Sequence, residues 1–180
     1  MTEEMIDTTA LASFLERTIG PAHDMEVSNH EGGHSNVTLF VEWGERDLVL
    51  RRPPPGETAD SAHDVLREYR IMDALQETHV RVPRTVVKCS DTDVVGCKFY
   101  LMERNHGVVL RDELPEEFDT ASAKTAIGES LVDGLVEIHS VDYGEVGLEE
   151  LGSPDGYIER QVRIWQNQFE WAFQRTNQER

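Results

Sequence analysis

The sequence predicts an α+β fold in which a five-stranded antiparallel sheet with one inserted helix precedes an all-helical part. Short β-branched and aromatic runs, separated by glycine-bearing turns, indicate antiparallel strands in the first half. One amphipathic helical pattern interrupts these runs at residues 61–79, and only helical patterns follow residue 119. We expect the join between the two parts near residues 105–111.

The first element is a short helix over residues 8–19, TTALASFLERTI. Asp7 or Thr8 is its expected N-cap and Gly20 its stop. Three strands follow, at residues 25–31, 36–43 and 48–52. A glycine loop separates the first two strands and a tight GERD turn separates the second and third, which is typical of an antiparallel meander.

A helix and two more strands complete the first half. The helical pattern at residues 61–79 has Asp60 or Ser61 as its expected N-cap. Residues 80–90 and 98–104 are expected to form two strands around a turn. The sheet would therefore contain five strands with one helix inserted before the last two.

Two long helices are expected in the second half. The pattern at residues 119–139 has an apolar stripe of Ile127, Leu131, Leu135 and Ile138. After the loop at residues 152–156, one broad aromatic helix face consists of Ile158, Val162, Trp165, Phe169 and Phe173. No other segment of the chain is obviously long enough to cover this face.

The composition is strongly acidic, with 35 acidic and 17 basic residues and a net charge of −18, and only three of the basic residues are lysines. Such a surface is either simply solvated or adapted to high salt, and the scarcity of lysine favours the salt-adapted (halophilic) interpretation. A nucleic-acid partner is not expected, because phosphate backbones need a basic face. The first residues, MTEEMIDTT, lack signal-peptide features, and no apolar run approaches the ~20 residues that span a bilayer. We therefore expect a cytoplasmic protein without a membrane partner.

Three side chains with potential chemistry are expected to have structural roles only. Cys89 and Cys97 flank a turn-like SDTDVVG segment and could face each other across a hairpin. A disulfide framework or a metal site needs more ligands, so buried or half-buried free thiols are expected. His63 lies on the outward side of the predicted helix and is expected at the surface.

The helical pattern at residues 61–79 carries a carboxylate at an apolar position. Its inward stripe consists of Val65, Tyr69, Ile71, Met72 and Leu75. Glu68 falls in the middle of this stripe, where a carboxylate is costly unless a cation meets it. Strand alternation puts Arg51 on one face with Val49 and Arg52 on the other. Glu68 should therefore either pair with Arg51 or reach the edge of the sheet without a specific partner.

The glycine loop EGGHSN, residues 31–36, lies between the first two strands after the helix. Adjacent glycines let backbone N–H groups approach a phosphate, and Ser35 and Asn36 would add donors. An ordinary hairpin turn explains the same residues, since the loop lacks both the GxxxxGK[ST] and the GxGxxG patterns.

In combination and in this order, these pieces resemble the small lobe of protein-kinase-like enzymes. The segments HSNVT, LVLRRPPPG, SAHDVLREYRIMDAL, VPRTVV, GCKFYLMERNHGVVLRD, LVDGLVEIHSVD and YIERQVRIWQNQFE are similar to the phosphotransferase family of aminoglycoside-phosphotransferase type. The likeness is greatest to the branch found beside or fused to acyl-CoA dehydrogenases, and it covers residues ~10 to 180. It implies a nucleotide-binding lobe at residues 1–106, followed at residues 107–180 by a connector and the start of a helical lobe.

The resemblance implies roles for residues around the phosphates of ATP. The loop over the phosphates would contain Gly32, Gly33, Ser35 and Asn36. Arg51 would stand where related kinases have the lysine that holds the α- and β-phosphates, with Glu68 as its helix partner. Val49, on the same face as Arg51, would also contact the nucleotide. Arginine in place of lysine still provides cationic donors, in a wider fork.

The resemblance also implies an adenine site after the last strand. Met102 would guard the adenine pocket. The backbone carbonyl of Glu103 and the backbone amide of Asn105 would bind the edge of the base. ATP and Mg²⁺ are the expected cofactors of the complete enzyme, and a small molecule with a hydroxyl group is the expected acceptor.

The motifs that carry catalysis in such enzymes do not occur in these 180 residues. Related enzymes share an H-G-D-x-x-x-x-N loop and a later D-x-D or D-W-E segment, which hold the acceptor hydroxyl and Mg²⁺. The nearest segments, HSVDYG at 139–144 and SPDG at 153–156, lack the spacing and the asparagine. The expected function is therefore the N-terminal part of an ATP-dependent phosphotransferase, truncated before its catalytic loop and not catalytic alone.

Two alternatives remain open from the sequence. The first is a non-catalytic binding or regulatory module that uses its exposed aromatic helix face to pair with a separately encoded partner half. The second is an acidic scaffold without a nucleotide role. Nucleotide binding separates both from the phosphotransferase interpretation.

Overall fold

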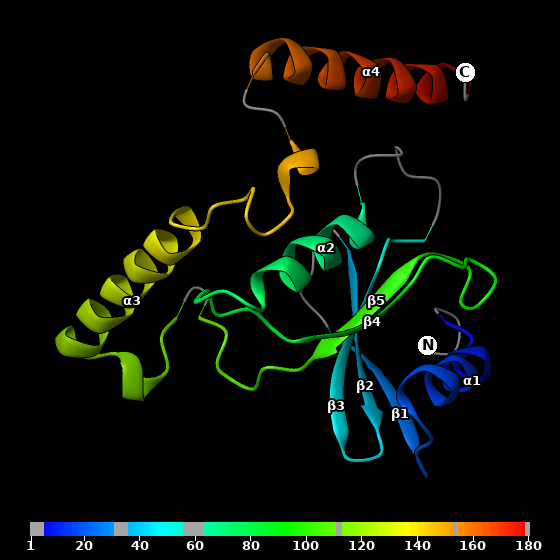
Figure 1. Ribbon diagram of the computed structural model, residues 1–180, viewed down its shortest axis with the longest axis horizontal. Coiled ribbons are helices and arrows are strands. Elements are labelled where there is room, and N and C mark those ends of the chain that lie inside the picture. Colours follow the sequence, from blue (N-terminus) through cyan, green and yellow to red (C-terminus); the bar gives the residue numbers. More distant parts are fainter. Residues whose placement is uncertain (1–5, 31–35, 56–62, 111–112, 153–154, 179–180) are drawn as a thin grey trace.

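The computed structural model describes residues 6–30, 36–55, 63–110, 113–152 and 155–178. Figure 1 shows a twisted sheet next to helices α1 (Thr8–Ile19) and α2 (Val65–Leu75), with the longer helices α3 (Ala121–His139) and α4 (Tyr157–Gln178) beyond it. The predicted α+β class and the five-stranded antiparallel sheet are confirmed. The division at residue 106 stays a prediction.

The sheet has the strand order β1-β2-β3-β5-β4, and all neighbouring strands are antiparallel. The strands are β1 (Met25–Asn29), β2 (Val37–Trp43), β3 (Arg46–Arg52), β4 (Thr85–Cys89) and β5 (Phe99–Glu103). The first three form the expected meander, while β5 lies between β3 and β4. In the GERD turn, Gly44 has φ +60° and Glu45 has a negative φ, which fits a two-residue type II′ hairpin.

Helix α1 begins and ends where the sequence predicts. The side chain of Asp7 caps the helix by accepting a hydrogen bond from the Ala10 amide at 2.9 Å, and Gly20 follows its last residue. Because both signals are local in sequence, the boundaries could be predicted without knowledge of tertiary packing.

Helix α2 is shorter than the predicted range 61–79, which is a correction. Asp64 is its N-cap and accepts from the Arg67 amide at 3.0 Å, whereas the expected caps at residues 60 and 61 lie outside the described residues. At the other end, the Thr78 hydroxyl and amide both donate to the Leu75 carbonyl, at 2.7 and 3.0 Å. This tight turn replaces the next helical hydrogen bond and ends the helix.

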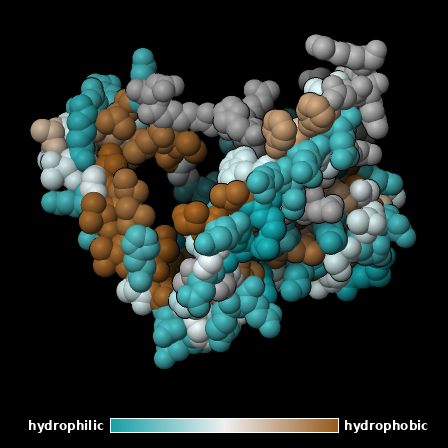
Figure 2. Space-filling view, turned by 90° about the horizontal axis from the view of Figure 1, so that it is seen from above, coloured by the Kyte–Doolittle hydropathy of each residue, from teal (hydrophilic) through white to brown (hydrophobic). Residues whose placement is uncertain are grey.

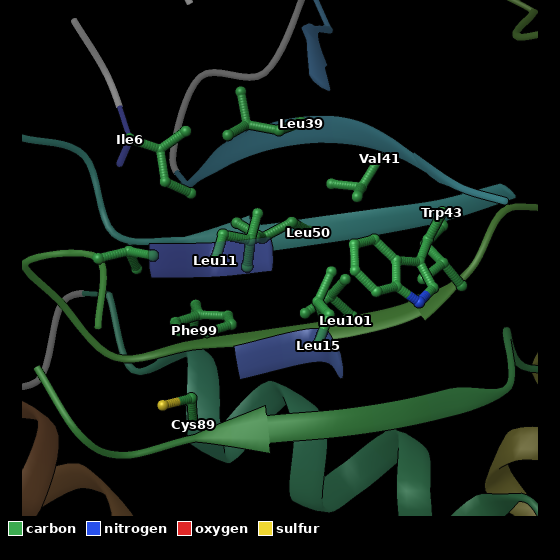
Figure 3. Close-up of a cluster of buried hydrophobic side chains, with 12 residues drawn as sticks. Ile6, Leu11, Leu15, Leu39, Val41, Trp43, Leu50, Cys89, Phe99 and Leu101 are labelled. Atoms are coloured by element: carbon green, nitrogen blue, oxygen red, sulfur yellow. The ribbon is translucent and has the colours of Figure 1, made fainter. Parts of the chain in front are cut away.

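The main core lies between α1 and one face of the sheet. Leu11 and Leu15 of α1 are fully buried against side chains of β2, β3 and β5, including Leu39, Leu50 and Leu101 (Figure 3). Burying side chains of this size stabilises a fold by about 1.5–3 kcal/mol each before the entropy of ordering is counted. Helix α1 therefore covers one face of the sheet, and the opposite face carries α2 and the candidate functional site.

Helix α2 also contacts the helical part through its outward arginines. The Arg67 Nη2 donates to the Leu151 carbonyl and the Arg70 Nη2 to the Gly147 carbonyl, both at 3.0 Å. These carbonyls lie in or next to the short 3-10 helix η2 (Glu149–Leu151), which the sequence patterns did not indicate. The position of α2 is therefore linked to the chain that follows α3.

The helical part contains η1 (Glu116–Phe118), α3 (Ala121–His139) and α4 (Tyr157–Gln178). Both predicted apolar stripes are largely exposed: on α4, Trp165 is 67% and Phe169 69% exposed, and on α3, Leu131 is 66% exposed. Figure 2 shows hydrophobic side chains gathered at the left, the side on which α3 lies in Figure 1. Faces of this kind mark contact surfaces.

Among the described residues, no helix is long and apolar enough to cross a membrane. The cytoplasmic location and the salt-adapted surface stay predictions from composition. Both cysteines are free thiols, with Cys89 buried and Cys97 half-buried, as expected. Burial raises the pKa of both thiols, which favours their protonated, unreactive form.

Candidate functional site

Two rows of side chains cross β2, β3 and β5 on the sheet face opposite α1. Residues paired across antiparallel strands share one face, so the strand register defines each row. The first row is Thr38, Arg51 and Tyr100. The second row, two residues along each strand, is Phe40, Val49 and Met102. One row is polar and the other mainly apolar, and Glu68 of α2 lies next to the polar row.

Arg51 and Glu68 form an ion pair across this face. The Arg51 Nη2 lies 3.3 Å from Glu68 Oε2, and the Arg51 Nε donates to the same oxygen at 3.4 Å. The side chains are 24% and 36% exposed, so the pair is partly open to solvent on the face of the central strand β3, although Glu68 falls within an apolar stripe of the helix. Of the two outcomes left open by the sequence, the specific pairing is the one that the structure shows.

Other side chains hold Glu68 in place. The Asn36 Nδ2 donates to Glu68 Oε1 at 2.5 Å, and the Tyr100 hydroxyl donates to Oε2 at 3.2 Å. The Arg51 Nη1 donates in turn to the Thr38 hydroxyl at 2.7 Å. A network of this kind fixes the ion pair far better than an isolated surface pair would be fixed.

Tyr100 is 1% exposed, and its environment disfavours the phenolate. Burial, and then the neighbouring Glu68 carboxylate, raise the pKa of Tyr100 from 10.0 to about 12. The hydroxyl therefore stays protonated and can donate to Glu68 over the whole neutral range.

We expect Tyr100 to ionise well above the ordinary pKa of a tyrosine, and its loss of a proton to destabilise the fold. Since the folded-state pKa lies above the unfolded value, this stabilisation is complete below pH 10 and is lost as the pH rises through about 12. A difference titration of phenolate absorbance between the wild type and Tyr100→Phe measures this directly. If the part of the absorbance change that is lost in Tyr100→Phe titrates near 10.0, the pKa of Tyr100 is not raised and the prediction is wrong.

His63 is a residue of the site that the sequence interpretation placed wrongly. It was expected at the surface, but it is half-buried and its Nδ1 lies 3.0 Å from Asn36 Oδ1. The error follows from the helix boundary: α2 begins at Val65, so the helical phase that put His63 outward does not apply to it. No local pattern in the sequence indicated its contact with Asn36, which lies 27 residues earlier in the chain.

The segment that follows β5 contacts the apolar row through Arg104. The Arg104 guanidinium carbon lies 3.6 Å from the centre of the Phe40 ring, and Asp47 accepts from its Nη1 at 3.4 Å. The predicted adenine-edge residues, Glu103 and Asn105, flank this arginine and are exposed. The Glu103 amide donates to the Arg84 carbonyl at 2.7 Å, so the proposed base contacts would use the Glu103 carbonyl and the Asn105 amide, and these roles stay predictions.

The described part of the chain covers most of the predicted site. Asn36 and Arg51 both contact Glu68, and Val49 and Met102 are neighbours in the adjacent row. Gly32, Gly33 and Ser35 lie outside the described residues. Within those residues, no group of three or more His, Cys, Asp or Glu side chains is placed to hold a metal ion. The nucleotide-binding roles stay predictions.

Comparison with known proteins identifies the family. The family model described as "Phosphotransferase enzyme family" matches residues 26–178. The chain belongs to this family. Acyl-CoA dehydrogenase family member 10 of Mus musculus is 36% identical over 169 residues, which are 93% of this chain and 16% of that protein. Acyl-CoA dehydrogenase family member 11 of Rattus norvegicus is 32% identical over 174 residues, which are 93% of this chain and 22% of that protein.

A solved structure extends the family assignment to the fold. The crystal structure of a protein provisionally assigned as an aminoglycoside phosphotransferase, from Ralstonia eutropha, matches with a TM-score of 0.72 and 33% identity. The match covers 92% of this chain and 48% of that chain. The predicted family resemblance and the kinase-like fold of this phosphotransferase family member are confirmed. The chain therefore spans about half the length of the solved relative. It spans only 16% and 22% of the lengths of the two acyl-CoA dehydrogenase family members.

Proposed function

We propose that this chain forms the ATP-binding part of a phosphotransferase that transfers the γ-phosphoryl group of ATP to a hydroxyl of a small molecule. The observation that carries the proposal is the Arg51–Glu68 ion pair on the open sheet face of a phosphotransferase family member. In kinase-like enzymes a cation on the third strand, held by a helix glutamate, binds the nucleotide phosphates.

Arg51 has the donors that phosphate binding requires. A guanidinium carries five N–H groups in one plane, and two of them are on Nη1. Thr38 accepts one hydrogen bond from Nη1, while Glu68 accepts from Nε and Nη2. The second N–H on Nη1 is then available for a phosphate oxygen. Glu68 would serve to orient the fork and would not touch the nucleotide.

The neighbouring apolar row suits a purine base. Val49 and Met102 are cross-strand partners and present adjacent apolar side chains two residues from the polar row. The Arg104 guanidinium already covers the ring of Phe40 at 3.6 Å, so a base would lie against Val49 and Met102 beside it. The backbone at residues 103–105 would then reach the edge of the base, as the family resemblance implies.

Mg²⁺ would accompany the ATP phosphates and neutralise charge in the transfer step. The residues described here do not form a metal site of their own, and the catalytic-loop motif does not occur in the 180 residues. We therefore assign to this chain the binding and orientation of the nucleotide. Phosphoryl transfer and acceptor choice would need the region that corresponds to the unmatched half of the solved relative.

ATP binding tests the proposal. We expect ATP with Mg²⁺ to raise the melting temperature of the chain, since a ligand at 100 times its Kd stabilises a fold by about 2.7 kcal/mol. Chemical-shift changes in NMR spectra should map to β2, β3 and β5. Binding that maps only to α3 and α4 would refute the nucleotide site. So would a lack of binding at millimolar ATP when a region that corresponds to the unmatched half of the solved relative is also present.

A second candidate is a non-catalytic module that pairs with a partner half. The exposed apolar faces of α3 and α4 favour it, because side chains such as Trp165 and Phe169 are two-thirds exposed. A region that corresponds to the unmatched half of the solved relative would cover these faces, within one polypeptide or from another. The ATP experiment separates the two candidates, since a pure pairing module gains no stability from the nucleotide.

A further inference from the structure

We infer that His63 is a positioning residue of the phosphate site: its Nδ1–H orients the Asn36 amide, and Asn36 in turn holds Glu68 against Arg51. The inference rests on the proposed nucleotide function and deepens it. It concerns a side chain that is linked to Arg51 through Asn36 and Glu68.

The direction of each hydrogen bond follows from the chemistry of the partners. An ionised carboxylate only accepts, so the Asn36 group that faces Glu68 Oε1 at 2.5 Å is the Nδ2 donor. The Oδ1 of the same amide therefore faces His63 and needs a donor, which is the Nδ1–H at 3.0 Å. The neutral Nδ1–H tautomer and the protonated ring both provide it.

Burial makes the orientation of this amide matter. Asn36 is only 4% exposed, so water cannot readily replace a lost partner. A flipped amide would place its carbonyl oxygen against the Glu68 carboxylate, which is repulsive, and its NH2 group toward His63. The donor on His63 favours the productive orientation over the flipped one by one hydrogen bond.

The effect reaches Arg51 through the carboxylate. Asn36 fixes Oε1 of Glu68 and Tyr100 fixes Oε2, so the carboxylate plane has a set orientation. The Arg51 Nε and Nη2 dock on that plane, which turns Nη1 toward Thr38 and the proposed phosphate position. Loss of the His63 bond should therefore weaken phosphate binding and leave base binding unchanged.

Variants of His63 test the inference by comparing ATP with adenosine, which has no phosphates. His63→Ala should raise the Kd for ATP about two- to tenfold, the equivalent of one hydrogen bond, and leave the Kd for adenosine unchanged. His63→Asn places an amide N–H near the position of Nδ1 and should restore ATP affinity to within about twofold. His63→Gln, whose amide reaches the Nε2 position, should behave like alanine.

His79 provides a matched control, because it is exposed and bonds to Ser140 and the Glu137 carbonyl, away from the site. His79→Ala should leave both affinities unchanged. Equal ATP affinity of His63→Ala and the wild type would overturn the inference, as would parallel losses for ATP and adenosine, which indicate a general structural role.

A spectroscopic measurement separates failure of the inference from failure of the proposed function. Long-range ¹H–¹⁵N spectra of the nucleotide-free protein should show His63 with its proton on Nδ1. A neutral ring protonated only on Nε2 would refute the Asn36 link whether or not ATP binds. If the wild type shows the Nδ1–H form and binds no ATP, the network stands and the proposed nucleotide function fails.

Discussion

Replacing Arg51 with methionine is expected to raise the Kd for ATP about 10- to 100-fold. A hydrogen bond to a charged group contributes about 1.5–3 kcal/mol, and 1.4 kcal/mol corresponds to a factor of ten in Kd. Methionine keeps much of the side-chain volume but removes the Nη1 donor that lies next to Thr38. Calorimetric titration of ATP into both proteins measures the change.

Two further variants show whether the fork or only the charge matters. Arg51→Lys keeps the charge but cannot dock on Glu68 through two nitrogens, so an intermediate loss is expected. Arg46→Met removes an exposed arginine at the other end of the same strand, and ATP affinity should not change. Equal affinity of Arg51→Met and the wild type would show that the phosphates bind elsewhere.

The Arg51 variants should change nucleotide binding far more than stability. The ion pair is partly exposed, and partly exposed pairs contribute only about 0–1 kcal/mol to folding, while Asn36 and Tyr100 still hold Glu68 when Arg51 is replaced. A fold held mainly by α1 and the opposite face of the sheet can therefore tolerate the loss of Arg51. This separation makes ATP affinity a direct readout of the site.

Local signals in the sequence predicted those parts of the fold that local interactions determine. Helix α1 could be delimited because Asp7 and Gly20 stand at its ends. The insertion of β5 between β3 and β4 could not, since strand order depends on contacts between residues far apart in sequence. The end of α2 was missed because Thr78 ends the helix through side-chain and backbone bonds to Leu75 that no periodicity reveals.

The same distinction applies to the candidate site. Alternation along β3 correctly put Arg51 and Arg52 on opposite faces, so a pairing of Arg51 with Glu68 could be expected. The sequence could not decide that this pairing occurs, because the deciding contacts come from Asn36 and Tyr100, each 32 residues from Glu68. His63 was misplaced for a related reason, since its partner Asn36 lies 27 residues away.

Replacing Leu15 with alanine is expected to lower the free energy of unfolding by about 3 kcal/mol, within the ~2–5 kcal/mol typical of large-to-small core substitutions. Leu15 is fully buried, and its neighbours in the core come from the strands that α1 covers (Figure 3). A urea titration should show a lower midpoint with an unchanged slope. Glu16→Ala, an exposed change at the next position of the helix, should alter stability by less than about 0.5 kcal/mol.

The Leu15 variant also tests whether the two faces of the sheet act independently. Leu15 packs on the face opposite Arg51, so the folded fraction of Leu15→Ala should bind ATP with the Kd of the wild type. A loss of stability below about 1 kcal/mol would show that α1 does not cover the core as the structure has it. A large rise in the ATP Kd without unfolding would instead show that packing under the sheet sets the geometry of Arg51, and the site would then depend on α1 as well as on α2.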